Sequence, residues 1–501
     1  MKGKTQAIVA AATGLVSVLG LIVWAYSDAP IGSSSNSNQK LRRAPGAVPV
    51  LGDALTINAH LDKFHDFILE IFENNGNKTF SMRIPFEPMG VIVNDPKIVE
   101  YILKTKFHVF DKGPRFQNAF HDFLGRGIFN SDGEGWKSQR KLAANIFNVK
   151  NFKDFVSDVF VNEMDNFSQV LSEHAKAGDE FDLQDLFYRF TFDSFTKIAF
   201  GVDMNTVSEK DKAPFMVAFD EVQARTAKRF LTPMWETSEY MSGQATIHAR
   251  QIREIREFGK DIIRKKRAND EAGIVCSESD LLSLLMKVKD DRGQLPSDEL
   301  LVDYALNFLL AGRDTTATVL TWAIYCLSQN PSCLEALHQE LSALDCSSPT
   351  YEQMKSQLPY ANAVFHETLR LYPSVPTNQK QANADDILPD GTIIPKGATV
   401  GWSAYAMGRT EAIWGPDAKQ FRPERWLEMQ KQPSPFDYPV FHAGPRVCLG
   451  KSMAELEGVF VLVQLLRQFN VQVLNGKDAK YSLSILLPMT GGLKARVSAR
   501  V

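Results

Sequence analysis

Cys448 is the residue whose surroundings most restrict how this chain can fold. It stands in residues 441–450, FHAGPRVCLG, where two glycines and a proline predict a tight loop. A segment with the pattern of a helix, KSMAELEGVFVLVQLL, follows directly. Backbone N–H groups and the positive end of a helix dipole are expected to lower the pKa of a thiol at this place. The segment therefore predicts a thiolate at the start of a helix, with Arg446 as a nearby cation for an anionic group.

The remaining composition narrows the class of protein. The other cysteines are sparse and unpatterned, which argues against a disulfide framework and favours a reducing compartment: Cys276, Cys326, Cys333 and Cys346. The chain of 501 residues is 44% hydrophobic and 23% charged, as in ordinary globular proteins. Its formal net charge of −3 lacks the basic surplus that phosphate backbones attract, so we expect no nucleic-acid partner.

An uncharged segment near the N-terminus predicts a membrane anchor. Residues 7–26, AIVAAATGLVSVLGLIVWAY, would span roughly 30 Å as a helix, about the thickness of the hydrocarbon core of a bilayer. A cleaved signal peptide is the alternative, because MKGKT resembles the basic start of such a peptide. We expect a transmembrane helix over 7–26 and a flexible Ser/Asn-rich linker over 27–44. A single domain is expected over 45–501, on the cytosolic side by the bias of flanking basic residues.

The body of the chain is predicted to be mainly α-helical with a minor β-sheet. Strand patterns with turns occur at residues 80–95 and 387–403. The longest helix is predicted over residues 297–330, with Ser297 as its N-cap. Three charged residues within it make a second membrane span costly, so a buried core helix is expected: Asp303, Arg313 and Asp314.

Several motifs together resemble the cytochrome P450 superfamily. Residues 441–450 fit its heme-binding loop, FxxGxRxCxG, at all five positions. HETLRLYP resembles its ExxR pair, FRPERW follows at the family's spacing, and GWKSQRK resembles its WxxxR helix. Residues 311–316, AGRDTT, match its [AG]GxDT motif. The resemblance covers roughly residues 45–501 and implies the cytochrome P450 fold behind an N-terminal transmembrane helix.

The resemblance implies heme b (iron protoporphyrin IX) as cofactor, with Cys448 as the ligand of its iron. Phe441, Gly444 and Arg446 then belong to the loop that carries this ligand. Further residues are expected at the heme propionates: Trp136, Arg140 and, by a weaker correspondence, Lys380. A buried charged triad is expected to brace the cysteine loop: Glu367, Arg370 and Arg425.

Thr315 and Asp314 are the catalytic residues that the resemblance implies. The hydroxyl of Thr315 is suited to hydrogen bonding near the reacting oxygen, and Asp314 is suited to relaying protons from solvent. Gly312, which has no side chain, is expected to leave room for dioxygen between the helix and the heme.

The implied activity is that of a membrane-bound heme-thiolate monooxygenase, which inserts one oxygen atom of O2 into a lipophilic substrate. Because the body is accounted for by one such domain, electrons are expected from a separate partner. NADPH–cytochrome P450 reductase is the expected donor, with cytochrome b5 as a second, and the endoplasmic reticulum membrane is the expected location. Basic residues near the cysteine loop could form a docking face: Lys137, Arg140, Lys141, Arg422 and Lys451.

Within the superfamily, the motifs look most like the fatty-acid and alkane ω-hydroxylases of plants, yeasts and water moulds. We therefore expect ω-hydroxylation of long-chain fatty acids, with a sterol, an alkane or a xenobiotic as alternative substrates. A reductase-independent lipid hydroperoxide isomerase or dehydratase and a heme sensor are the alternatives from other classes. The pocket is expected to include residues 205–240 and 112–130, with phenylalanines that suit an acyl chain: Phe116, Phe120, Phe123 and Phe129.

Overall fold

The computed structural model describes residues 41–48, 51–147, 150–209, 211–271, 280–287, 293–344 and 356–500, with the single positions Ser17 and Gln353. The predicted anchor over 7–26, apart from Ser17, and the predicted linker up to residue 40 lie outside this range. Within the described ranges, no helix has both the length and the hydropathy that crossing a bilayer requires.

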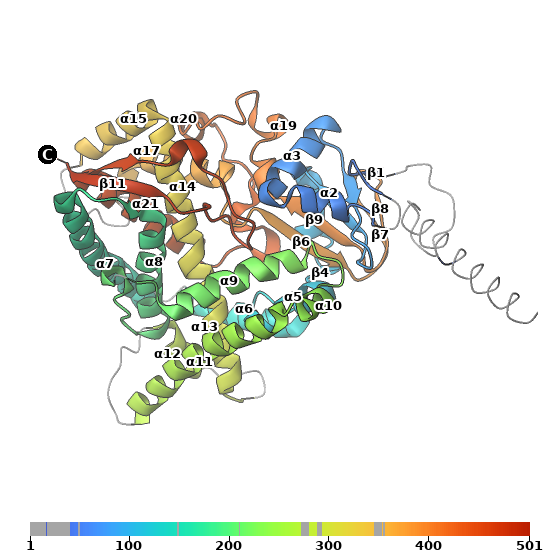
Figure 1. Ribbon diagram of the computed structural model, residues 1–501, viewed down its shortest axis with the longest axis horizontal. Coiled ribbons are helices and arrows are strands. Elements are labelled where there is room, and N and C mark those ends of the chain that lie inside the picture. The colour runs from blue at the N-terminus through green and yellow to red at the C-terminus, as the bar shows by residue number, and fades with distance from the viewer. Residues whose placement is uncertain are drawn as a thin grey trace, which may run out of the picture.

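The predicted mainly helical fold with a minor sheet is confirmed. Figure 1 shows most helices gathered on one side of the molecule and the largest sheet, with α2 and α3, on the other. The helices of the first half are α2 (Ala54–Ala59), α3 (Phe64–Asn74), α4 (Pro96–Glu100), α5 (Gly113–Leu124), α6 (Gly133–Phe147), α7 (Lys150–Ala177), α8 (Leu183–Phe200), α9 (Pro214–Arg229), α10 (Trp235–Met241) and α11 (Gln244–Glu271). Those of the second half are α12 (Leu281–Lys287), α13 (Asp298–Leu309), α14 (Thr315–Gln329), α15 (Pro331–Ser342), α17 (Pro359–Leu371), α18 (Ala404–Met407), α19 (Glu411–Trp414), α20 (Glu424–Glu428) and α21 (Lys451–Gln468).

Both predicted strand regions form sheet. The largest sheet has the order β1 (Arg42–Arg43), β2 (Phe80–Met82), β3 (Gly90–Val93), β9 (Thr399–Ser403), β6 (Thr377–Ala382) and β4 (Phe110–Asp111). In it, Phe80 pairs with Ile92 across an antiparallel turn, and β3 runs parallel to β9. Two small antiparallel sheets join β10 (Phe469–Val473), β11 (Lys494–Ala499) and β5 (Phe181–Asp182), and β7 (Asp386–Ile387) with β8 (Ile393–Ile394).

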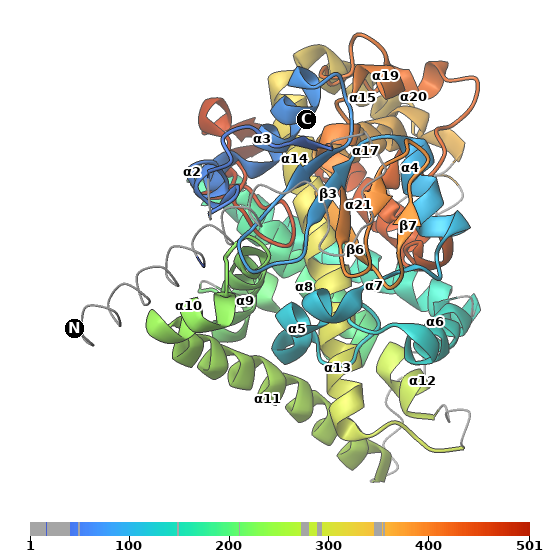
Figure 2. The ribbon, with the colours of Figure 1, turned by 90° about the vertical axis from the view of Figure 1, so that its right-hand side faces the viewer.

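The predicted long helix is present but is interrupted in the middle. Ser297 caps it as expected, because its Oγ accepts a hydrogen bond from Leu300 N at 3.3 Å. Residues Leu310–Asp314 form a π-helical turn between α13 and α14. Figure 2 shows α13 and α14 running end to end through the helical part of the molecule. A π-turn holds one residue more than an α-turn, so it changes which side chains face each neighbour beyond it.

The main hydrophobic core surrounds α14 and holds its position. Trp322 of α14 is buried, stacks on Tyr372 with ring centroids 4.1 Å apart, and donates from Nε1 to Leu487 O at 2.8 Å. A smaller core lies against the sheet and includes Val91, Val400 and Trp402. Fully buried aromatic side chains contribute most to such cores, so the central helix is a fixed wall for any site beside it.

Candidate functional site

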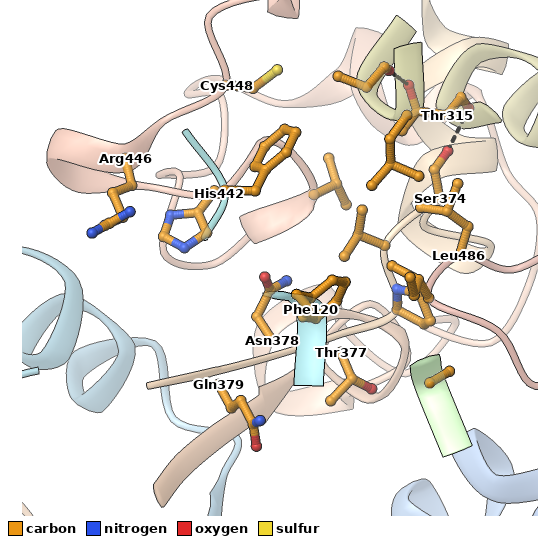
Figure 3. A pocket seen from close by; sticks show the side chains of 18 of the residues that line it. Phe120, Thr315, Ser374, Thr377, Asn378, Gln379, His442, Arg446, Cys448 and Leu486 are labelled. Atoms are coloured by element: carbon orange, nitrogen blue, oxygen red, sulfur yellow. Dashed lines mark hydrogen bonds between the residues drawn. The ribbon is translucent and has the colours of Figure 1, made fainter. Parts of the chain in front are cut away.

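A cavity of about 480 Å³ lies where the central helix, the sheet and the cysteine loop meet. Its walls come from α5, α6, the π-turn, α14, β6 and residues 440–450. Figure 3 shows Thr315, Asn378 and Cys448 around this space, each from a different part of the chain. Most of the remaining wall consists of apolar side chains, among them Phe116, Leu310 and Val319.

The cysteine loop is held by its own backbone. Cys448 N donates to Phe441 O at 2.8 Å, and Val447 N donates to Gly444 O at 3.0 Å. Gly444 has φ +64°, and a Cβ there would lie 2.1 Å from Leu103 O, so this turn requires a glycine. The loop presents Cys448 to the cavity, immediately before α21 begins at Lys451.

The expectation that its surroundings lower the pKa of Cys448 is wrong for the protein alone. Exclusion of water by the surrounding protein raises the pKa of the Cys448 thiol, although the Gly450 N–H and the charge of Arg140 act in the opposite direction. The helix start and one half-buried arginine are too weak to offset desolvation. A cation at the sulfur stabilises the thiolate far more strongly than these groups do.

A group of cations lies beside the cysteine loop. Arg446 donates to Asp132 Oδ1 at 2.6 Å, and its guanidinium lies 4.3 Å from the ring centroid of Trp136. Burial, and then the charge of Arg446, lower the pKa of Lys112 to about 7. Burial, followed by the charges of Lys112 and Arg446, lowers the pKa of Lys380 far below its ordinary value. Lys380 Nζ has no hydrogen-bond partner among the described residues, so this buried amine lacks an acceptor.

The predicted residues of this region separate into two groups. Five line the cavity: Trp136, Arg140, Phe441, Arg446 and Cys448. Gly444 and Lys380 do not line it. Lys380 lies behind the wall, with Nζ 5.9 Å from the ring centroid of Phe107. Lys112, which sequence reasoning missed, lines the cavity in addition.

The three residues predicted as a charged triad lie together in the interior. Glu367 accepts hydrogen bonds from Arg370 Nε at 2.8 Å and Nη2 at 2.7 Å, and Arg425 Nε is 3.5 Å from it. The two carboxylate oxygens also accept from Arg422 N and Trp426 Nε1. Arg370 in turn donates to the carbonyl oxygens of Gly408, Ala418 and Gln420. The triad thus fastens α17 to the chain that leads into the cysteine loop.

Thr315 lines the cavity at the end of the π-turn. Its Oγ1 donates to Ala311 O at 2.6 Å, and its own carbonyl accepts from Ser374 Oγ at 2.7 Å (Figure 3). Gly312 lines the same cavity, and its missing side chain also serves the packing of α8. A Cβ at Gly312 would lie 1.8 Å from Cδ2 of Phe195, so a larger residue would displace this phenylalanine, and the expected room for dioxygen stays a prediction.

Asp314 faces a second cavity, of about 440 Å³, and not the first. Its Oδ2 accepts from Gln223 Nε2 at 2.6 Å, and Arg313 Nη1 lies 2.8 Å from Oδ1. Burial raises the pKa of Asp314 to about 6, although Arg313 opposes the shift. Arg313 also forms an ion pair with Asp220. Lys212 contacts the same carboxylate at 2.8 Å, and the side chain of Lys212 is partly exposed to solvent. Three residues line both cavities: Leu483, Ser484 and Leu486.

The predicted aromatic pocket is present in large part. Phe116, Phe120 and Phe129 line the first cavity, whereas Phe123 is buried against Phe219 with ring centroids 5.0 Å apart. From residues 205–240, three apolar residues reach the wall: Ala227, Phe230 and Leu231. The predicted loop over 112–130 is mostly the helix α5, which places Phe116 and Phe120 on the cavity, and Phe129 follows the end of this helix.

Comparison with known proteins agrees with this geometry. The family described as Cytochrome P450 matches residues 43–492. The chain belongs to the cytochrome P450 family. It is 34% identical to cytochrome P450 704B1 of Arabidopsis thaliana, over 92% of this chain and 96% of the relative. It is 33% identical to cytochrome P450 94A2 of Vicia sativa, over 97% of both chains. With cytochrome P450 86B1 of Arabidopsis thaliana the identity is 35%, over 85% of this chain and 80% of the relative.

P450 proteins bind heme through a cysteine thiolate and act as monooxygenases with a redox partner, and the residues found here fit that cofactor. Heme b carries two carboxylate side chains. The unpartnered Lys380 Nζ, together with Lys112 and Arg446, supplies cations for carboxylates beside the loop that presents Cys448. The P450 assignment made from the sequence motifs is therefore confirmed, as are the enzyme class and the cofactor.

A buried carboxyl in the cavity wall was also missed from the sequence. Glu457 of α21 lines the cavity, and burial raises its pKa to about 8, so the protonated form predominates at neutral pH. Its spacing from Cys448 contains no signal of burial, because the helix α21 alternates charged and apolar residues over its first turns. Only the packing of α21 against α14 and α17 determines that this residue faces inward.

Proposed function

We propose that this P450 is a membrane-bound fatty-acid ω-hydroxylase in which Cys448 is the iron ligand. The apolar wall of the first cavity, with Phe116 and Phe120 from α5 and Phe129 after it, is the observation that carries the substrate class. Each methylene of an acyl chain that leaves water contributes about 0.8 kcal/mol, and such a wall provides the contact. The plant sources of the relatives agree with the ω-hydroxylase branch that the motifs resemble.

We assign the heme-side roles to residues on the wall. Cys448 holds the iron, Arg446 and Lys112 bind propionate, and Trp136 and Arg140 complete that side, with Lys380 as a cation behind it. The bound heme would supply oxygen activation, to which a thiolate ligand contributes electron density. The residues of the protein hold this group, exclude water and deliver protons. Glu367, Arg370 and Arg425 have a structural role: they hold α17 to the segment that precedes the cysteine loop.

A substrate panel tests the fatty-acid assignment. The heme-loaded full chain, reconstituted with reductase, is titrated with fatty acids from lauric to oleic acid, a sterol and a small aromatic. We expect the fatty acids alone to shift the iron to high spin and to be hydroxylated at or near the ω-carbon. A spin shift with the sterol or the aromatic and none with any fatty acid would overturn the substrate class, but not the P450 assignment.

The positions of Thr315 and Asp314 support a proton route between the two cavities. The hydroxyl of Thr315 donates to Ala311 O, which fixes Oγ1 and leaves its lone pairs to orient a proton donor in the first cavity. Asp314 faces the second, more polar cavity, and Arg313, Asp220 and Lys212 continue from it to solvent. With a pKa near 6, Asp314 can both take and release a proton at neutral pH.

Replacing Thr315 by alanine is expected to uncouple the reaction. Positioned acid–base groups contribute roughly 10²–10⁴-fold, so the yield of product per NADPH should fall steeply while hydrogen peroxide rises. Heme content and substrate affinity should stay within twofold of wild type. Thr315→Ser, which keeps the hydroxyl, is the matched control and should retain most coupling. Equal coupling in the alanine and wild-type enzymes would remove Thr315 from proton delivery.

The electron donor and the membrane complete the proposal. NADPH–cytochrome P450 reductase is the proposed donor, with cytochrome b5 as an accessory. Of the five basic residues expected at the docking face, Lys137 pairs with Glu134 at 2.7 Å and Arg422 with Glu428 at 2.6 Å. Arg140, which lines the cavity, serves the heme instead.

A transmembrane anchor over 7–26, with the domain over 45–501 on the cytosolic side of the endoplasmic reticulum, remains our proposal. Removing residues 1–40, which leaves β1 in place, is expected to release the protein from membranes in carbonate without loss of heme. A full-length chain that carbonate extracts equally well, or a mature protein beginning near residue 28, would refute the anchor.

A further inference from the structure

One ion pair in the cavity wall has no place in the roles described so far. Among the described residues, six Glu, Lys or Arg side chains line the first cavity: Glu87, Lys112, Arg115, Arg140, Arg446 and Glu457. Lys112, Arg140 and Arg446 lie on the heme side, and Glu457 is mostly protonated. Glu87 and Arg115 remain, and Arg115 donates to Glu87 and to the carbonyl of Phe230 at the end of α9, away from the cysteine loop.

The pair joins three elements where the cavity meets the surface. Arg115 of α5 donates from Nε to Glu87 Oε2 at 2.6 Å, and from Nη2 to Phe230 O at 2.8 Å. Glu87 lies in the turn between β2 and β3, and Phe230 ends α9. Both charged side chains are 15% exposed, and the neighbouring Phe86 is 60% exposed. Arg115 is therefore at the solvent end of the cavity, fixed on two sides.

The guanidinium of Arg115 keeps donors free for a ligand. Nη1 makes no hydrogen bond to any residue that the structure describes, and Nη2 uses only one of its two hydrogens. A planar guanidinium held in place by Glu87 and a backbone carbonyl can bind a carboxylate with its remaining edge, as forked arginine–carboxylate pairs do. An ester or an alcohol cannot form that charged contact.

We propose that Arg115 binds the carboxylate of the substrate at the mouth of the cavity, with Glu87 as the group that orients the guanidinium and weakens its hold. This deepens the proposed fatty-acid hydroxylation and rests on it. An acid bound at its head extends its chain into the apolar interior, with its methyl end toward the heme. Glu87 partly neutralises the cation, which allows a charged product to leave.

Two opposite substitutions test this with the heme-loaded full chain. The dissociation constants of lauric acid and of methyl laurate are measured by the spin-state change, at low ionic strength. Arg115→Gln is expected to raise the dissociation constant of lauric acid about tenfold, because one charged hydrogen-bonded contact is lost. The dissociation constant of methyl laurate should change less than twofold. Glu87→Gln should lower the dissociation constant of lauric acid severalfold and leave that of the ester unchanged, because it removes a negative charge near the negative carboxylate of the acid. Arg115→Lys should restore part of the affinity for the acid.

The outcomes separate the two proposals. Two results would show that the pair only holds the three elements together. One is an equal loss of affinity for the acid and the ester in Arg115→Gln, and the other is weaker binding of the acid in Glu87→Gln. Binding of neither compound to the wild-type enzyme would refute the fatty-acid function itself, and this inference with it. A normal ferrous–CO spectrum in each variant establishes that the fold and the heme site are intact. Arg264→Gln, a change at a residue 64% exposed on α11, is the matched control and should alter neither constant.

Discussion

Replacing Cys448 by histidine is expected to abolish monooxygenation and to remove the red-shifted Soret band of the ferrous–CO complex. That band requires a thiolate ligand on the iron, and a neutral imidazole would donate less electron density. Heme can still bind through the cation group beside the loop, because Lys112 and Arg446 do not depend on the sulfur. The measurement is the difference spectrum of the purified holoprotein, with product formation at saturating reductase falling to background.

Cys326→Ala is the matched control for this variant. Cys326 is buried in α14, where burial raises the pKa of its thiol well above the ordinary value, so it is not suited to ligate a metal. The control should keep the full Soret band and close to wild-type activity. A red-shifted band that survives in Cys448→His would refute the assignment of the ligand.

Replacing Glu367 by glutamine should destabilise the protein by about 3–5 kcal/mol, the cost of breaking a buried ion pair from one side. Glu367 and Arg370 are both fully buried, and the carboxylate accepts four hydrogen bonds at 2.7–2.9 Å, from Arg370, Arg422 N and Trp426 Nε1. Without its charge, Arg370 is left as an uncompensated cation. Denaturant unfolding, followed by the loss of the heme absorbance, measures the change.

The exposed pair of Lys137 and Glu134 provides the comparison. It has the same spacing of three residues on a helix, but its side chains are 60% and 87% exposed. Glu134→Gln should therefore cost less than about 1 kcal/mol. If the two glutamine variants lose similar stability, the interior triad is not what holds the segment before the cysteine loop.

Features that depend on short stretches of chain could be predicted from the sequence. Ser297 caps the long helix because its hydroxyl reaches an N–H three residues on, and such a pattern is visible in the residues themselves. The turn at Gly444 belongs to the same class, since a left-handed φ favours glycine. The grouping of Cys448, Arg446 and Trp136 at one cavity came from motif resemblance, and the structure brings these three residues together.

Features that depend on packing between distant segments could not be predicted. The space beside Gly312 belongs to Phe195, more than a hundred residues earlier, and no local pattern identifies that neighbour. Gln223 of α9 reaches Asp314 from 91 positions away. Lys112 lies in a segment that the sequence pattern marked only for its phenylalanines. Lys112 comes near Arg446 because α5 begins beside Asp132, a contact between distant segments.

The π-turn at Leu310–Asp314 has a consequence for how water and protons are kept apart. Thr315 and Asp314 are consecutive residues, yet one faces the apolar cavity and the other the polar cavity. The central helix is thus a partition one helix thick. On the proton route proposed above, a proton would cross it through rearrangement of two adjacent side chains, and Leu483, Ser484 and Leu486 line both cavities beside this helix. On this proposal, protons would reach the first cavity through the helix, by a path separate from the mouth at Arg115 where substrate enters.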